Sequence, residues 1–426
     1  MSQLALLGGT PVIDGPLAPY PSMGEGEAKA VGEVVRSGCL SGFFGSPGPE
    51  FLGGPKVRAF EEAWCERFAI KHTVSVNSAT SGLIAAIGAL GIGPGDEVIV
   101  PPWTMSATAV APLFYGAIPV FADIEDETFS IDPAAVEANI TAKTRAILAV
   151  NLFGHPARLA ELRRIADTHG LFLIEDNAQA PLATEDGKPC GTVGHIGVFS
   201  LNFHKHIHTG EGGMCVTADD ELGQRLQLIR NHGENLAGEW EIEDIANIVG
   251  FNFRMSELSA AIGLVQLAAI DAHVGRRERL AEALSEGTRG LEGWTPPKVR
   301  QGCRHNYYAW LARFEAQALG IGREVFSKAL AAEGFPNAVG YVAPLYLLPL
   351  FSRRRAFGGD GYPFTLTNRV YQPGLCPIAE RLHRDEAVLF EPCAYDVDEA
   401  TAGRLAEAVR KVHQHRAELA AIEVED

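Results

Sequence analysis

From about residue 70 to residue 217, short apolar runs alternate along the chain with stretches of helical periodicity, notably Ser81–Leu90 and Ala157–His169. The runs are rich in Val, Ile, Leu and Phe and lack strict alternation, which is typical of strands buried on both faces of a mostly parallel sheet. The expected strands are Thr73–Val76, Glu97–Val100, Ile118–Ala122, Ala146–Val150, Leu171–Glu175, Ile196–Ser200 and Met214–Thr217. This order predicts an α/β fold with a three-layer large domain around a mostly parallel sheet.

The remainder of the chain predicts a second, smaller domain. One long helix from Ser256, its N-cap, to about Glu286 would end the large domain, which we expect to span residues 1–290 with its N-terminal arm. Residues 287–302 are rich in Gly and Pro and are typical of a linker. Residues 291–426 then predict an α+β domain with a strand at Tyr307–Phe314, a helix near Arg323–Glu333, a Pro- and Gly-rich stretch and a terminal helix from about Asp398.

Charge and cysteine content restrict the partners and the compartment. The formal net charge of −17 argues against nucleic acid or an anionic membrane as a partner. The seven cysteines have no close pairing, which is typical of reduced thiols in a cytoplasmic protein. The N-terminus lacks a basic region before an apolar run, so we expect no signal peptide.

The uncharged stretch Val98–Ala122 is long enough to span a bilayer. It contains four prolines, a glycine and several hydroxyl residues. We therefore expect a strand, a buried helix and a second strand there, with no membrane span.

Four polar clusters fall at strand ends or turns, where open α/β sheets bind their ligands. The first, Asn77–Gly82, precedes a helix, and its hydroxyl residues suit either ordinary capping or a phosphate held at the helix N-terminus. The second, Ile174–Gln179, ends a strand. Its Asp176 suits pairing with a cationic ring nitrogen, although metal binding, base catalysis or a solvated strand-end acid are alternatives.

The third cluster, Phe199–Gly213, places Lys205 between a buried strand and a Gly-rich turn. Desolvation and neighbouring cations would lower the pKa of Lys205 and leave more free amine for imine formation. His204, His206 and His208 would face one side of an extended segment, as a zinc site requires, but no accompanying ligand pattern is present. We therefore expect no metal there. The fourth cluster, Gly250–Glu257, precedes the long helix and also suits a plain capping turn.

Together these clusters resemble the DegT/StrS-type sugar aminotransferases, fold-type I pyridoxal-phosphate enzymes, from about Leu4 to the C-terminal helix. The family pattern is a Phe-Ser strand, a lysine five residues after that Ser, and a Gly-Glu-Gly-Gly turn. Here these are Phe199-Ser200, Lys205 and Gly210-Glu211-Gly212-Gly213. Glu175-Asp176-Asn177-Ala178-Gln179 and Asn252-Phe253-Arg254-Met255-Ser256-Glu257 complete the resemblance.

The resemblance implies a role for each matching residue. Lys205 would form the internal aldimine with pyridoxal 5'-phosphate and then move the proton. Asp176 would pair with the pyridine nitrogen, and Gln179 would lie near the phenolic oxygen. Ala79, Thr80 and Ser200 would hold the phosphate. Asn252 would reach the phosphate of the neighbouring subunit, which implies a homodimer with shared active sites.

Three departures from the family pattern concern the same site. Where the family often stacks an aromatic residue on the cofactor, this chain has Met105, with Trp103 two residues away and, on a strand, on the same face; either would cover the ring. Asn177 replaces a small residue. One branch of the family replaces the lysine by histidine and removes a sugar hydroxyl, whereas here Lys205 is present, which favours transamination.

The expected activity is ping-pong transamination from glutamate or glutamine to a keto-sugar, often nucleotide-linked, or a keto-cyclitol. The opening Leu6–Pro11 leans towards the cyclitol-type members of the family. The alternatives are a pyridoxal-phosphate-dependent sugar dehydratase, a non-enzymatic regulatory protein on the same fold, and a zinc hydrolase. Candidate residues on the acceptor side, for each of which a structural role is as well founded, are Asn151, His155, His232 and Tyr341.

Overall fold

The computed structural model describes residues 3–420 and is built on a seven-stranded sheet. Its strand order is β1-β9-β8-β5-β4-β2-β3, and β9 runs antiparallel to both of its neighbours while the other pairings are parallel. The strands are β1 (His72–Val76), β2 (Glu97–Val100), β3 (Ile118–Phe121), β4 (Thr144–Val150), β5 (Phe172–Asp176), β8 (Ile196–Ser200) and β9 (Gly213–Thr217). All seven expected strands are confirmed, with ends that differ by at most two residues.

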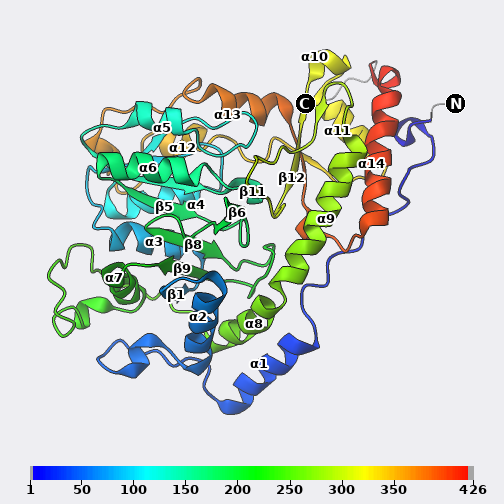
Figure 1. The fold of residues 1–426 in the computed structure, drawn as a ribbon. Helices are drawn as coiled ribbons and strands as arrows, with labels where there is room; N and C mark the ends of the chain where they lie inside the picture. Colours follow the sequence, from blue (N-terminus) through cyan, green and yellow to red (C-terminus); the bar gives the residue numbers. More distant parts are fainter. Residues whose placement is uncertain (1–2, 421–426) are drawn as a thin grey trace.

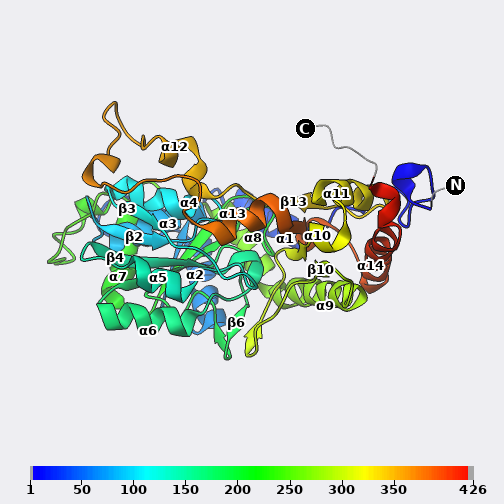
Figure 2. The same ribbon diagram turned by 90° about the horizontal axis from the view of Figure 1, so that it is seen from above.

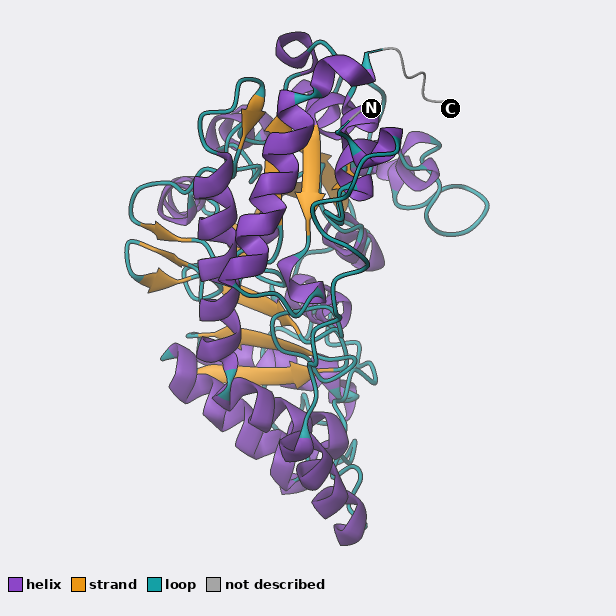
Figure 3. Ribbon diagram, turned by 90° about the vertical axis from the view of Figure 1, so that its right-hand side faces the viewer, coloured by secondary structure: helices purple, strands orange, loops and turns teal. Residues whose placement is uncertain are grey.

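Helices cover both faces of this sheet, so successive strand residues enter different cores. Val98 and Val100 pack with the apolar helix α3 (Ala79–Ala89), whereas Ile99 between them packs with α6 (Leu159–His169). Both faces are therefore sealed from water, which explains why the strand sequences do not alternate. The three-layer α/β architecture is confirmed, and Figure 3 shows the strands lying between helices.

Further helices and a small hairpin surround this unit. The helices are α1 (Glu25–Ser37), α2 (Pro55–Phe68), α4 (Ala107–Val110), α5 (Pro133–Asn139) and α7 (Asp220–Arg230). The hairpin β6 (Thr184–Glu185) and β7 (Lys188–Pro189) pairs with β11 (Cys303–Arg304). The uncharged stretch folds as β2, α4, a 3-10 turn (Ala111–Tyr115) and β3, as expected. Within residues 3–420, no single helix is long and apolar enough to cross a membrane, and one bent pair passes by length and composition alone.

The single long helix expected after Ser256 is wrong, because the segment forms two helices. Ser256 caps α8 (Glu257–Ala268) by accepting the N–H of Ser259 at 3.1 Å, as predicted. At Ala269 the axis turns by 56° into α9 (Ile270–Thr288). The two parts pack against different partners, α8 on α1 and α2 and α9 on α14 (Glu399–Gln414), so one straight helix would lose one of these contacts (Figure 1).

A second hydrophobic core lies between α9, α14 and a four-stranded sheet. The order of this sheet is β10 (Trp294–Thr295), β12 (Trp310–Phe314), β14 (Ala387–Phe390) and β13 (Ala338–Val339), and the helices α10 (Ala316–Leu319) and α11 (Arg323–Ala332) belong to the same unit. Leu280 and Leu284 of α9 and Leu4 and Ile13 of the N-terminal arm enter this core. The division of the chain at residue 290 stays a prediction. In the structure, α9 packs with the C-terminal segment.

Part of the C-terminal segment folds back over the large sheet, at α12 (Pro349–Ser352) and beyond (Figure 2). Arg369 there forms a two-point ion pair with the buried Glu97 at the start of β2, at 2.8 and 3.0 Å. The Tyr371 hydroxyl donates to the carbonyl of Pro119 in β3 at 2.8 Å. Residues distant in sequence therefore cover β2 and β3, at one lateral side of the sheet.

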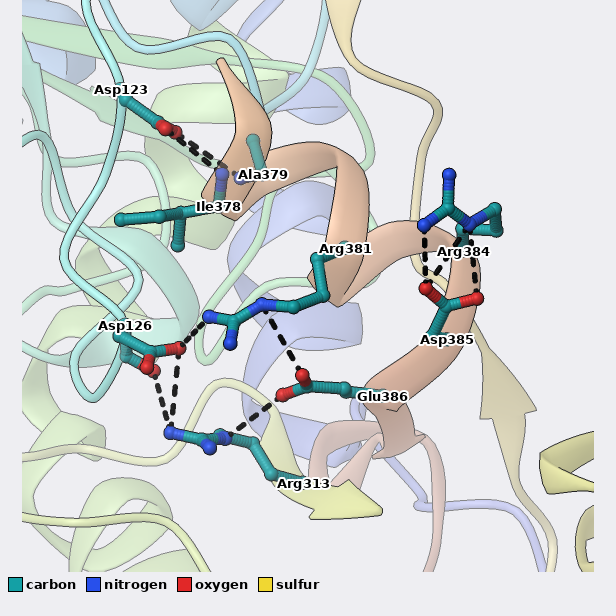
Figure 4. Close-up of polar contacts among 9 residues, drawn as sticks. All are labelled: Asp123, Asp126, Arg313, Ile378, Ala379, Arg381, Arg384, Asp385 and Glu386. Carbon is teal, nitrogen blue, oxygen red and sulfur yellow. Dashed lines mark hydrogen bonds and ion pairs between the residues drawn. The ribbon is translucent and has the colours of Figure 1, made fainter. Parts of the chain in front are cut away.

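A polar network also joins the loop after β3 to the C-terminal helices (Figure 4). Asp123 accepts the N–H groups of Ile378 and Ala379, at 2.9 and 3.1 Å, where α13 (Pro377–Arg381) begins. Asp126 and Glu386 both pair with the same two cations, Arg313 and Arg381. Each arginine thus bridges two carboxylates from different parts of the chain.

A third contact between distant segments lies before β12, where the chain meets the turn Leu152–Gly154 that follows β4. Asn306 N–H donates to the carbonyl of Gly154 at 3.1 Å, and Ala309 N–H donates to that of Phe153 at 3.1 Å. The Asn306 side chain donates to the carbonyl of Pro181 at 2.7 Å. Gly154 has φ +95°, and a Cβ on it would lie 1.8 Å from Oδ1 of Asn306, so this junction requires glycine.

We predict that Gly154→Ala destabilises the protein far more than Gly187→Ala. Gly187 has a similar φ of +78° but nothing within 4 Å of a Cβ, so alanine there costs about 1 kcal/mol of backbone strain. Alanine at position 154 adds the clash with Asn306 to the same strain. Urea denaturation of both variants measures the difference, and equal midpoints would contradict the described junction.

Candidate active site

The predicted polar clusters meet at the edge where the parallel strands end. Asp176 is the last residue of β5 and pairs in register with Val198 of β8, two residues before Ser200. Gly213 lies between Ser200 and Val76 in cross-strand register, so the end of β8 and the end of β1 are separated by one residue of β9. The segments that follow β1, β5 and β8 therefore share one edge.

The start of α3 forms an anion-binding geometry at this edge. The Ser78 hydroxyl accepts the N–H of Ser81 at 3.1 Å, and the N–H groups of Ala79 and Thr80 have no intrahelical acceptor. A Cβ on Gly213 would lie 2.8 Å from the nitrogen of Ala79, so the strand and the helix start are in close contact. Ala79, Thr80 and the half-buried Ser200 are thus brought together as a group that suits a phosphate.

The two consecutive carboxylates at the end of β5 have different surroundings. Glu175 is fully buried and accepts N–H groups from Gly191, Val193 and Gly194 at 2.6 to 2.7 Å, with Asn151 at 3.3 Å. Burial raises the pKa of Glu175, and these four donors oppose the shift. Glu175 therefore fixes the turn before β8, and its hydrogen-bonding capacity is used within the protein.

Asp176 is also buried but has fewer partners. Its oxygens accept the Thr108 hydroxyl at 2.9 Å and the N–H of Ala178 at 3.2 Å. Burial raises the pKa of Asp176, and Thr108, Ala178 and the charge of Lys205 lower it. Within residues 3–420, no Lys, Arg or His pairs with it directly. The alternative of a solvated strand-end acid is wrong, because the carboxylate is buried and suits a cation from a ligand.

Thr108 was not among the residues singled out from the sequence. It is fully buried in α4, inside the uncharged stretch Val98–Ala122, and its Oγ1 also lies 3.5 Å from that of Thr104. Hydroxyl residues in an uncharged run are the only signal in the sequence, and they do not single out Thr108, because its partner Asp176 is distant in sequence.

Lys205 lies in a turn after β8, partly buried beside Asp176. Burial lowers the pKa of Lys205 to about 8, as the sequence predicts, and Asp176 opposes this shift. Neighbouring cations were also expected to lower this pKa, but the other groups that act on it, Cys393 and Glu391, raise it. The Lys205 Nζ lies 4.4 Å from the centre of the Tyr308 ring.

Gln179 is held at both ends of its amide. Its Oε1 accepts the N–H of Phe153 at 2.6 Å, and its Nε2 donates to the Tyr341 hydroxyl at 3.1 Å. The Tyr341 ring packs edge-on against Phe153 and Trp103. Tyr341, named from the sequence as an acceptor-side candidate, therefore belongs to the frame that positions Gln179.

Trp103 and Met105 do not share a strand face, because β2 ends at Val100 and residues 101–105 form a bend. The Trp103 ring is fully buried and donates Nε1–H to the carbonyl of Val342 at 2.8 Å. Met105 is 60% exposed. Which of the two covers a cofactor ring stays a prediction.

Asn252, expected to serve a neighbouring subunit, is exposed. Its Oδ1 accepts Nε–H of Arg254 at 2.8 Å, and its carbonyl lies 3.5 Å from the side-chain nitrogen of Asn77 at the start of the α3 turn. Its role across a subunit interface stays a prediction.

The three histidines around Lys205 do not gather on one face. They lie in turns, with His204 exposed and His206 and His208 buried. Arg277 of α9 donates to both Nδ1 and the carbonyl of His206, at 3.0 and 2.9 Å. Among residues 3–420 no group of three His, Cys, Asp or Glu side chains is arranged to hold a metal, so the zinc interpretation has no structural support.

Most of the remaining acceptor-side candidates have structural partners. Asn151 is fully buried and holds Glu175, Asn177 and the N–H of Ala157. His155 accepts the N–H of Arg300 at 3.1 Å, and burial lowers its pKa to about 4. Asn177, which replaces a small residue of the family pattern, donates to the carbonyls of Ala180 and Cys190. Only part of the edge is therefore left for a ligand.

We predict opposite stability effects for the two carboxylates. Glu175→Gln turns an amide N–H group towards N–H donors and costs about 2–3 kcal/mol of unfolding free energy. Asp176→Asn removes a buried charge with few partners, so the protein without cofactor keeps its stability or gains some. Urea denaturation of both variants checks this, and the reverse order would contradict the assigned roles.

The DegT/DnrJ/EryC1/StrS aminotransferase family matches residues 46–388 of the chain. An L-glutamine:2-deoxy-scyllo-inosose aminotransferase from Streptomyces kanamyceticus is 36% identical over 440 residues and 99% of each chain. GDP-perosamine synthase from Caulobacter vibrioides is 37% identical over 300 residues, 70% of this chain and 79% of that one. The structure of DesI in the presence of its TDP-sugar product matches with a TM-score of 0.81 at 30% identity, covering 99% of this chain and 98% of that chain. As the motifs predict, the chain belongs to the DegT/DnrJ/EryC1/StrS aminotransferase family.

Proposed function

We propose that this enzyme transfers an amino group from glutamate or glutamine to a keto-cyclitol or a keto-sugar, often nucleotide-linked, by a ping-pong reaction. The observation that carries the proposal is Asp176, a buried carboxylate with no cationic side chain paired to it within residues 3–420, beside a lysine of lowered pKa. Enzymes of this family depend on pyridoxal 5'-phosphate. A protonated pyridine nitrogen is the cation that Asp176 lacks.

The residues present fit this cofactor. The start of α3, with Ala79, Thr80 and Ser200, would hold the phosphate, because N–H groups and a hydroxyl converge there. Asp176 would hold the ring nitrogen, and Gln179 would lie near the phenolic oxygen with its amide fixed by Tyr341 and Phe153. When bound, the cofactor supplies an electron sink that allows an amino group to be exchanged for a keto oxygen.

Lys205 would attach the cofactor through its amine and then carry the proton between donor or acceptor carbon and cofactor carbon. With a pKa of about 8, a useful share of the amine is neutral near pH 7.5 and able to act as nucleophile or base. A lysine at this position supports transamination over the dehydratase alternative, whose family branch carries histidine there. Membership of a family of aminotransferases disfavours the regulatory alternative.

The acceptor class rests on the relatives. The S. kanamyceticus relative, which aligns over 99% of both chains, is named for glutamine and a scyllo-inosose, and this agrees with the cyclitol-type opening of the sequence. Other relatives are named for nucleotide-linked sugars, such as a UDP-N-acetyl-3-dehydro-glucosamine aminotransferase. We propose a keto-cyclitol as the first acceptor to test, in antibiotic or cell-surface sugar synthesis in the cytoplasm.

We also propose a homodimer with shared sites. Exposed apolar side chains near the candidate site support it, among them Phe203, 67% exposed two residues before Lys205, and Met105. Asn252 is exposed and available to a second subunit. Met105 or Trp103 would then complete the cover of the cofactor ring.

Lys205→Ala is expected to abolish the covalent attachment of pyridoxal phosphate. Borohydride reduction of the wild-type protein, followed by peptide mass spectrometry, should place the cofactor on Lys205, and the visible absorption band should disappear in the variant. Lys188→Ala, at an exposed lysine, is the matched control and should keep both signals. An adduct on another lysine, with activity retained in Lys205→Ala, would contradict the assignment.

The reactivity of Lys205 should rise with pH around a midpoint of about 8, instead of near the ordinary lysine value of 10.5. The neutral amine is the reactive form, so a lowered pKa moves the rise to lower pH. Because the charge of Asp176 raises this pKa, Asp176→Asn should move the midpoint lower still. Site-resolved labelling of the cofactor-free protein across pH measures both midpoints.

A further inference from the structure

We infer that Tyr308 is a positioning residue for Lys205: its ring face lies under the amine, holds it at the site and favours its ammonium form. The Lys205 Nζ lies 4.4 Å from the ring centre, within the range of a cation–π interaction. This inference rests on the proposed role of Lys205, and it adds a residue that the family motifs of this chain do not contain.

Tyr308 lies where the chain passes from one hydrophobic core to the other. Tyr308 packs in the core of the large sheet, whereas its neighbour Tyr307 packs in the second core. The two adjacent rings can enter different cores because the backbone turns at Tyr307. This residue has φ +51°, a strained conformation for a residue with a large side chain. The Asn306 side chain accepts the N–H of Tyr308 at 3.2 Å while donating to Pro181, so the strained turn is fixed on both sides.

The phenol group itself does not supply a charge. Burial raises the pKa of Tyr308 far above its ordinary value, so the hydroxyl stays protonated at every working pH. The carbonyl of Tyr308 lies 3.7 Å from Sγ of Cys393, which further fixes the backbone behind the ring. What faces the lysine is therefore a neutral aromatic surface.

The charged and titratable groups around Lys205 come from several elements. Asp176 faces it from β5. Cys393 faces it from the 3-10 turn Pro392–Ala394, and Glu391 faces it from the position just before that turn. His204 and His206 flank it on its own turn. Burial lowers the pKa of His206, and desolvation of the ring beside Phe203 and Tyr308, with the charge of Lys205, lowers that of His204, so both are neutral near pH 7. Arg277, from α9, pairs with His206 behind this turn.

These surroundings separate two opposing effects on the amine. Burial favours the neutral amine, which the reaction needs as a base, whereas Asp176 and the ring face favour the ammonium, which forms when the lysine takes up a proton. A ring with no charge of its own can hold both forms in the same place. Tyr308 would thus keep the amine at the site through the proton transfer.

The test measures the pKa of Lys205 in the full-length protein freed of cofactor, from the pH dependence of its reductive methylation followed by peptide mass spectrometry. Tyr308→Phe keeps the ring and should leave the pKa unchanged, whereas Tyr308→Leu should lower it by about half a unit to one unit. Tyr371→Leu, at a buried tyrosine whose ring packs against Phe121, Phe351 and Phe364, is the matched control and should leave the Lys205 pKa unchanged.

A second series keeps the proposal testable if Tyr308→Leu does not fold. Phenylalanine carrying one, two or three ring fluorines at position 308 keeps the shape and weakens the ring's attraction for a cation, so the Lys205 pKa should fall stepwise. An unchanged pKa in this series, an equal fall in Tyr308→Phe, or an equal fall in Tyr371→Leu would overturn the inference. Failure of Lys205 to bind the cofactor would instead refute the proposed function, and the labelling data would not depend on it.

Discussion

A sheet that is covered by helices on both faces leaves polar groups one place to gather, the edge where its parallel strands end. In this protein the two faces are filled by separate apolar clusters around α3 and α6. Buried charges can then persist only where backbone N–H groups, hydroxyls or a ligand satisfy them. The role of each polar group at this edge therefore depends on which hydrogen-bond donors or acceptors it meets.

Glu175 and Asp176 show the two solutions in adjacent residues. The side chains of a strand point to opposite faces, so consecutive carboxylates meet different neighbours. Glu175 meets a turn that presents three N–H groups, and it becomes part of the frame. Asp176 meets a hydroxyl and one N–H group, and a cation from a ligand would relieve its unfavourable burial. Hydrogen bonds among Glu175, Asn151 and Asn177 fix the backbone around Asp176.

The C-terminal segment contributes as much to the site as the strands do. Gln179 is oriented by Tyr341, Trp103 is anchored on Val342, and Lys205 lies over Tyr308. These contacts come from stretches that the sequence presents as loops or as a separate domain. Ion pairs and hydrogen bonds at Asp126, Glu97 and Gly154 join the large-sheet unit to segments after residue 300, which brings these side chains to the candidate site.

The sequence by itself determined the seven strands, the helices between them, the cap at Ser256 and the family, because apolar periodicity and local motifs are encoded in neighbouring residues. The strand-end clusters and the family resemblance also predicted Lys205, Asp176, Gln179 and the start of α3 as site residues, since each lies at the end of a buried strand or within five residues after it. The sequence did not show the bend at Ala269, the burial of Trp103, or the parts played by Thr108 and Tyr308. These depend on contacts between residues far apart in the chain, and tertiary packing alone decides which distant side chain a buried polar group meets.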